Sequence, residues 1–153
     1  MTNEEYMVIL ARYLKDAIMD PVSAYEDYVY AKNKKNELDR VGAYLVKRYG
    51  PGQGADIDNY YHALLQCELA QRGQPHLNNG LAMGYLKEHL YDRWKKSNSF
   101  GGKMSEDDFN KDVQKDLTNN ENGSIIGDIS MGLNCKELLD YLRTPRMRDA
   151  GIY

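Results

Sequence analysis

The chain has 153 residues, of which 42% are hydrophobic and 28% charged, and this composition indicates a globular domain rather than a disordered one. The formal net charge is −3, and lysine and arginine are spread along the chain. The densest basic run contains Lys32, Lys34 and Lys35, which is typical of a solvated helix face. Because nucleic-acid binders carry a concentrated basic surface, we expect no nucleic-acid partner.

The N-terminal segment is acidic and interrupted by charges, so it does not resemble a secretory signal peptide. No apolar run approaches the ~20 residues that a membrane-spanning helix needs. We therefore expect synthesis in the cytoplasm, with any export depending on a specialised secretion system. Cys67 and Cys135 lack metal-ligand spacing, and they allow either a disulfide or free buried thiols, the commoner case.

Hydrophobic residues at helical spacing predict three helices in the first third of the chain. The first spans about 3–19, and Asn3 is its expected N-terminal cap. The second begins at Pro21, because the residue before a proline is pushed out of the helical conformation. The third spans about 36–48 and ends in a glycine-rich loop at 49–54. The apolar stripes of the first two helices are expected to pack into the core.

Three further helices are predicted in a central region, residues 56–128. Their expected bounds are Asp56 or Asp58 to Arg72, Asn78 or Asn79 to Trp94, and Ser105 to Gly123–Gly127, with a turn at 74–76 and a loop at 99–102 between them. A last short helix spans about 135–143, and the tail at 144–153 is expected to be loosely ordered. Because no segment alternates as a strand would, the predicted fold is an all-α, single-domain bundle of about six or seven helices.

The first two central helices carry histidines beside carboxylates. Asp58 and His62 are four residues apart and share a helix face, where a carboxylate can orient an imidazole and favour its charged form. Glu88 and His89 are adjacent and point in different directions, so either one could face a cleft. The alternative is a surface ion pair and a histidine packed in the core.

The third central helix carries Asp112, Asp116, Asn119 and Asn120 at spacings that share one stripe. Two carboxylates on one stripe repel each other unless a cation, a histidine or a proton lies between them. A hard cation would accept the Asp and Asn oxygens, and a transition metal would also prefer His62. The alternative is a solvated acidic face with the asparagines at a helix end. The sequence assigns neither a metal nor a cofactor.

We expect the polar residues of the three central helices to converge in one cleft suited to hydrolysis. The expected catalytic residues are His62 as general base or metal ligand, Asp58 as its orienting group, Glu88 and Asp116 as acid partners or ligands, and Asn120 (or Asn119) as a donor to developing negative charge. The expected binding residues are Tyr61, Arg72, His89, Asp112 and Asn119. The alternative is a buried hydrogen-bond network that fixes the register of the helices.

The central region also resembles a known family. The aromatic-aromatic-His-Ala segment of serum amyloid A proteins is similar to the run Asp58-Asn59-Tyr60-Tyr61-His62-Ala63, and the family's Ala-Xaa-Arg-Gly ending is similar to Ala70-Gln71-Arg72-Gly73. The resemblance covers about Asp56 to Gly127. Related domains form a bacterial branch of the family, which is found at the C-terminal ends of polymorphic toxins. It implies a helical bundle and a toxin-associated effector module, and it implies no particular reaction.

These observations give two hypotheses about function, and they leave open whether the protein is an enzyme. The first is a bacterial effector domain with a hydrolytic cleft, whose partners would be a cognate immunity protein and a lipid or cell-envelope substrate. The second is a non-enzymatic module that binds lipid or protein through tyrosine-rich amphipathic helices. The sequence contains thirteen tyrosines, and tyrosine suits interfaces because its ring packs while its hydroxyl stays in water.

Overall fold

Helices form all the regular secondary structure in residues 1–94 and 104–153, the part of the chain that the computed structural model describes. They are α1 (Asn3–Met19), α2 (Pro21–Tyr49), α3 (Ile57–Ala70), α4 (Gln74–Leu86), the π-helix η1 (Lys87–Asp92), α6 (Glu106–Ile129), α7 (Cys135–Leu138), the 3-10 helix η2 (Asp140–Leu142) and α8 (Pro145–Asp149). The predicted all-α, single-domain bundle of six or seven helices is confirmed. The loop predicted at 99–102 lies outside the described residues.

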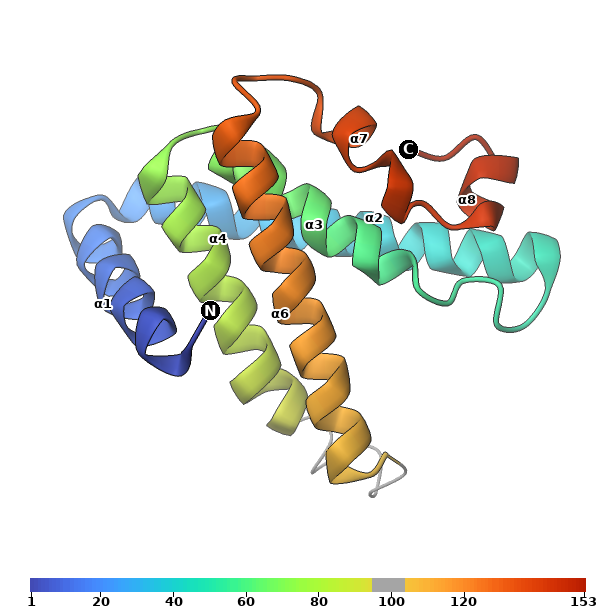
Figure 1. Ribbon diagram of the computed structural model, residues 1–153, viewed down its shortest axis with the longest axis horizontal. Coiled ribbons are helices and arrows are strands. Elements are labelled where there is room, and N and C mark those ends of the chain that lie inside the picture. Colours follow the sequence, from blue (N-terminus) through green and yellow to red (C-terminus); the bar gives the residue numbers. More distant parts are fainter. Residues whose placement is uncertain (95–103) are drawn as a thin grey trace.

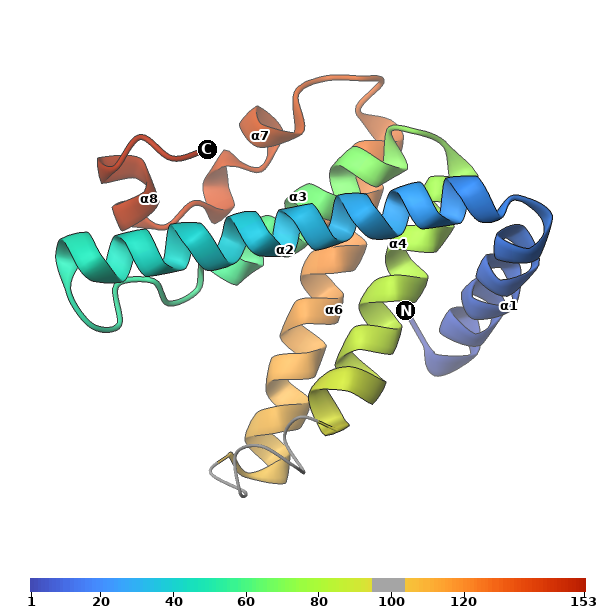
Figure 2. The same ribbon diagram turned by 180° about the vertical axis from the view of Figure 1, so that it is seen from behind.

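Helix α3 lies in the middle of the fold. Figure 1 shows α6 in front of α3 and α2 behind it, and Figure 2 shows the reverse order from the other side. Helix α4 runs beside α6, and α1 packs against α4 (Figures 1 and 2). The main apolar core surrounds α3 and contains Leu45, Ile57, Tyr60, Tyr61, Ala63, Leu64, Cys67, Cys135, Leu139 and Met147. Residues on other faces of α3 are therefore free to carry polar contacts.

The backbones of α3 and α6 touch at two glycines. A Cβ atom at Gly123 would overlap the backbone oxygen of Ala63, and a Cβ atom at Gly127 would overlap that of Cys67. The predicted end of this helix at 123–127 is wrong, because α6 continues to Ile129. The glycines serve the close approach of two helices rather than a turn, and this explains why their low helix propensity is tolerated.

A disulfide anchors the C-terminal part of the chain. Cys67 of α3 is bonded to Cys135 of α7, so the expectation of free thiols is wrong. The prediction of a loosely ordered tail at 144–153 is also wrong. Met147 of α8 is fully buried in the core around α3, and Arg143 Nε donates a hydrogen bond of 2.7 Å to the backbone oxygen of Ile152. The tail is held by this packing and by the hydrogen bond.

The helices α1, α2 and α4 differ from their predicted form in three details. Helix α1 has its predicted bounds, but Thr2 rather than Asn3 is its cap and accepts a hydrogen bond from the Glu5 backbone N–H. The two helices predicted between Pro21 and residue 48 are one helix, α2, because neither glycine nor proline interrupts the polar residues that join them. The turn predicted at 74–76 is the first turn of α4, where Pro75 occupies a position that proline tolerates.

The apolar stripe of α1 and the start of α2 packs into the fold only in part, so the expectation that it packs into the core is wrong for its exposed members. Ile18 is 80% exposed, and Val22 and Tyr25 are 66% and 65% exposed. Tyr6 is buried, and its ring stacks on Tyr85 at 4.6 Å between centroids, whereas Ile9, Leu10, Tyr13 and Ala17 are half-buried. No helix within the described residues has both the length and the apolar character needed to cross a membrane, as the sequence predicted.

Gly123→Ala should lower the free energy of unfolding by about 1–3 kcal/mol, because the added Cβ forces α3 and α6 apart. Asn122→Ala changes an exposed neighbour on the same helix and is the matched control, with an expected effect within about 0.5 kcal/mol. Denaturant unfolding followed by circular dichroism measures both variants. Equal stability of the two would contradict the backbone contact.

Candidate functional site

Four of the five expected catalytic residues meet where α3, η1 and α6 come together. His62 Nδ1 lies 3.1 Å from Asn120 Oδ1, and His62 Nε2 lies 3.4 Å from Asp116 Oδ2. A ring nitrogen of His62 and one carboxylate oxygen from each of Glu88 and Asp116 all lie within 4.8 Å of one another. We call His62, Glu88, Asp116 and Asn120 the polar centre.

Local helix geometry positions these side chains. Asp116 and Asn120 are one turn apart on α6, so both face α3. Gly84 of α4 makes room for Asn120, because a Cβ atom at this position would clash with the Asn120 amide. Glu88 lies in the π-helix η1, and π-helical turns are frequent at functional sites.

The hydrogen bond to Asn120 fixes the tautomer of His62. Because an amide oxygen can only accept, Nδ1 of His62 carries the ring proton and donates it to Asn120 Oδ1. Burial, and then the positive charge of Lys87, lower the pKa of His62, so the ring is neutral at neutral pH. The lone pair on Nε2 therefore faces the Asp116 carboxylate.

Both carboxyl groups of the polar centre have raised pKa values. Burial raises the pKa of Asp116 to about 7, and the negative charges of Asp58 and Asp112 add to the effect. Burial also raises the pKa of Glu88 to about 7, against the opposing influence of Lys87, whose Nζ lies 2.6 Å from Glu88 Oε1. Two acids and a neutral imidazole can therefore exchange protons near neutral pH.

Asp58, Asp112 and Asn119 lie at the rim of the polar centre rather than inside it. Lys115 Nζ is 3.6 Å from Asp58, 3.0 Å from Asp112 and 4.0 Å from Asp116. Asn119 Nδ2 donates a hydrogen bond of 2.9 Å to Asn59 Oδ1 beside this rim. The hydrogen-bonding contact of the His62 ring is with Asn120, whereas the charge of Asp58 acts on His62 by raising its pKa, against the larger effect of burial. The orienting role of Asp58 stays a prediction.

The other three expected binding residues lie elsewhere. Tyr61 belongs to the apolar core and packs edge-on against Tyr60, with 5.4 Å between ring centroids. His89 stacks on Tyr85 at 4.3 Å. Arg72 lies over the ring of Tyr30 at 4.1 Å. The contacts of these three side chains therefore lie outside the polar centre, and their binding role stays a prediction.

A second buried polar cluster was missed in the sequence. Asp27 of α2 is fully buried, and its carboxylate lies 2.8 Å from His76 Nδ1, accepts a hydrogen bond of 2.8 Å from Asn79 Nδ2 and lies 3.6 Å from Arg72. The only indication in the sequence is helical spacing. Asp27 lies one turn after Ala24 and therefore on the same face of α2, and that face is buried. This cluster joins α2 to the start of α4, and its carboxylate is already fully paired.

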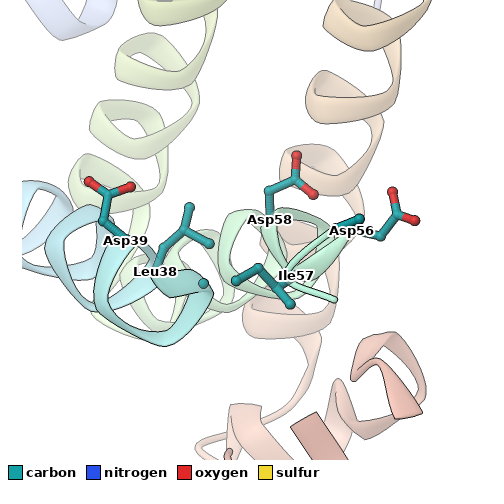
Figure 3. Close-up of a pocket in the computed structure, with 8 residues that line it drawn as sticks. Leu38, Asp39, Asp56, Ile57 and Asp58 are labelled. Carbon is teal, nitrogen blue, oxygen red and sulfur yellow. The ribbon is translucent and has the colours of Figure 1, made fainter. Parts of the chain in front are cut away.

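A pocket of about 380 Å³ opens between α2 and the start of α3. Figure 3 shows Leu38 and Ile57 facing each other in this pocket, with Asp39, Asp56 and Asp58 around them. Asp58 belongs both to the pocket lining and, through Lys115, to the rim of the polar centre. The pocket therefore has an acidic lining that shares Asp58 with the rim of the polar centre.

Asp27→Ala should lower the free energy of unfolding by about 2–3 kcal/mol, because it leaves His76 and Asn79 without their buried partner. The neighbouring Glu26 is exposed, so Glu26→Ala should change the stability by less than about 0.5 kcal/mol. Thermal and urea unfolding of the two variants give the comparison. A loss below about 0.5 kcal/mol for Asp27→Ala would show that the cluster does not stabilise the fold.

The chain matches no protein-family model, no curated protein and no solved structure.

Proposed function

We propose that this chain is a bacterial effector-type domain, of the branch that resembles serum amyloid A, and that it hydrolyses its substrate at the polar centre. One observation carries the proposal. A neutral imidazole presents the lone pair of Nε2 to a buried carboxyl group at 3.4 Å, with a second carboxyl group beside them. Proton acceptors and donors placed together in this way are typical of general acid–base catalysis.

Each residue of the polar centre has a role in this proposal. His62 accepts a proton from the attacking water through Nε2, and Asn120 holds the ring by its contact with Nδ1. Glu88 and Asp116 donate a proton to the leaving group. The Nδ2 atom of Asn120 is buried and donates to no residue in the described ranges, so it can stabilise negative charge that develops on the substrate.

The rim of the polar centre provides the route of access. The side chain of His62 is 14% exposed, whereas those of Asp58 and Lys115 are 34% and 37% exposed. A substrate group would reach His62 by displacing these two flexible side chains, with the rest of the substrate in the pocket of Figure 3.

The disulfide supports an effector that works outside the reducing cytoplasm. Disulfides persist in secreted proteins and in the bacterial periplasm, whereas cytoplasmic thiols are kept reduced. The bond between Cys67 and Cys135 therefore agrees with export by a specialised secretion system and with a lipid or cell-envelope substrate. A producing cell would need a cognate immunity protein as partner.

His62→Ala and Asp116→Asn should each abolish growth inhibition when the chain is directed to the periplasm of a bacterial host, and should lower hydrolysis of envelope material about 100-fold or more. Two variants are matched controls that should keep full activity. Asp107→Asn neutralises an exposed carboxylate at the start of α6, and Asn122→Ala changes an exposed residue of the same helix outside the polar centre. Full activity of folded His62→Ala would contradict the catalytic proposal.

The exposed apolar surface of α1 and α2 favours a second candidate function, binding of lipid or protein without catalysis. This surface includes Leu14, Ile18, Val22 and Tyr25, each more than half exposed. Tyr6 does not belong to it, because its hydroxyl donates a hydrogen bond of 2.8 Å to Glu121 inside the fold. Contiguous exposed apolar side chains mark binding surfaces in many proteins.

The double variant Ile18→Ser/Tyr25→Ser should bind anionic phospholipid vesicles less than the wild type if this second function holds, because it removes apolar contact area. His62→Ala leaves the surface intact and is the control, with binding equal to that of the wild type. Co-sedimentation with vesicles measures both. Equal binding by the double variant and the wild type would contradict the lipid-binding function.

A further inference from the structure

The three ligand-type side chains of the polar centre lie at distances close to those of a metal site. Two ligands that are each about 2.1 Å from a tetrahedral metal ion lie about 3.4 Å apart. His62 Nε2 and Asp116 Oδ2 are separated by 3.4 Å, and one ring nitrogen of His62 and one carboxylate oxygen from each of Glu88 and Asp116 lie within 4.8 Å of one another. A small movement of Glu88 toward the other two side chains would complete a three-ligand set.

We propose that His62, Glu88 and Asp116 bind one divalent transition-metal ion, and that Zn²⁺ fits this set best. One imidazole nitrogen and two carboxylate oxygens are ordinary zinc ligands. Calcium takes six to eight oxygens, so the imidazole and the small number of oxygens argue against it. Cys67 and Cys135 are bonded to each other and cannot compete for the ion.

Two incompletely paired atoms point to a cation at this position. The lone pair on His62 Nε2 faces a carboxylate oxygen, an arrangement that needs a proton or a cation between the two atoms. Asp116 is only 4% exposed, and its Oδ1 atom accepts no hydrogen bond from any residue in the described ranges, with the Lys115 ammonium group 4.0 Å away. Buried polar atoms are normally paired, so such an atom is a candidate ligand.

The contact with Asn120 matches the environment of histidines that bind metals. Such histidines donate the proton of their second ring nitrogen to an oxygen, which fixes the tautomer and aims the free nitrogen at the ion. His62 makes this contact to Asn120 Oδ1 at 3.1 Å, so Nε2 is the nitrogen left for the ion. Asn120 is thereby a positioning residue for the metal site.

The charges around the polar centre favour a cation. Within the residues that the structure describes, five carboxylates (Asp58, Glu88, Asp92, Asp112 and Asp116) lie in one connected cluster with two lysines (Lys87 and Lys115), and the formal charge of these seven side chains is −3. Lys87 is the competing cation, but Asp92 also holds its ammonium group at 2.7 Å. A divalent ion would offset most of the excess negative charge.

Three protein ligands leave a fourth position for water, as catalytic zinc sites do. An ion bound there would lower the pKa of this water and make it a nucleophile. For this catalytic role the inference rests on the proposed hydrolytic function, with one change of role. His62 Nε2 cannot bind the ion and also accept a proton, so the bound ion would activate the water in place of His62. Binding of the ion can be measured without any reaction.

Calorimetric titration of Zn²⁺ into the chelator-treated full chain, with its disulfide intact, tests the proposal. We expect one Zn²⁺ per chain and a higher unfolding temperature. Asn120→Ala should weaken binding about 10- to 100-fold because the ring of His62 loses its orienting contact, and His62→Ala and Asp116→Asn should weaken it further. The controls Asn122→Ala and Asp107→Asn should bind like the wild type, and excess Ca²⁺ should not displace Zn²⁺.

Absence of binding by the wild-type chain, or binding that is unchanged in both His62→Ala and Asp116→Asn, would overturn the metal site. The outcomes also separate this inference from the proposed function. Hydrolysis that depends on His62 but persists in excess chelator would support the proposed function and overturn the metal site. Binding of Zn²⁺ that depends on His62, with no hydrolysis or toxicity, would support the metal site and contradict the proposed function.

Discussion

The backbone contact between α3 and α6 is the constraint on which the rest of the structure depends. Gly123 packs on Ala63 and Gly127 packs on Cys67, one helical turn further along each helix. Because the backbones touch, the side chains just before the contact on each helix project toward each other. His62 precedes Ala63, and Asn120 lies one turn before Gly123. The polar centre therefore exists because two glycines allow this approach.

Helix α3 separates an apolar side of the fold from a polar one. Leu45 and Leu64 belong to the apolar core, whereas His62 and Gln66 make polar contacts with α6 and α4. Gln66 Nε2 donates a hydrogen bond of 2.9 Å to the backbone oxygen of Gly80, which fixes α4 beside α3. Partly paired networks of this kind cost stability, and such a cost is commonly found at functional sites rather than at purely structural ones.

The sequence predicted those features that depend on local patterns. Pro21 marks the end of α1, and Ser105 caps α6 by accepting a hydrogen bond from the Asp108 backbone N–H. The four-residue spacing in α6 also placed Asp116 and Asn120 on one face. Local patterns were enough here because each feature involves residues within a turn or two of each other.

Features that depend on distant partners could not be predicted in this way. In a sequence, a glycine that ends a helix cannot be distinguished from a glycine inside a helix. Only the contact with Ala63 shows that Gly123 lies where α6 packs against α3. The π-helix η1 adds a residue to one turn without any local marker in its sequence, so the choice between Glu88 and His89 stayed open. From its neighbours in the sequence, Asp27 resembles a solvated carboxylate. Only the fold shows that Asn79 of α4 donates a hydrogen bond to it.

The disulfide has a consequence for the order in which the molecule matures. It joins residues 68 positions apart, and the loop that it closes contains Glu88 and Asp116 but not His62. In the chain-entropy model, closing a loop of this size contributes about 4 kcal/mol to stability, and only after oxidation. Under reducing conditions the chain therefore lacks the covalent link that closes the loop carrying Glu88 and Asp116, and it gains this part of its stability only when its two thiols are oxidised.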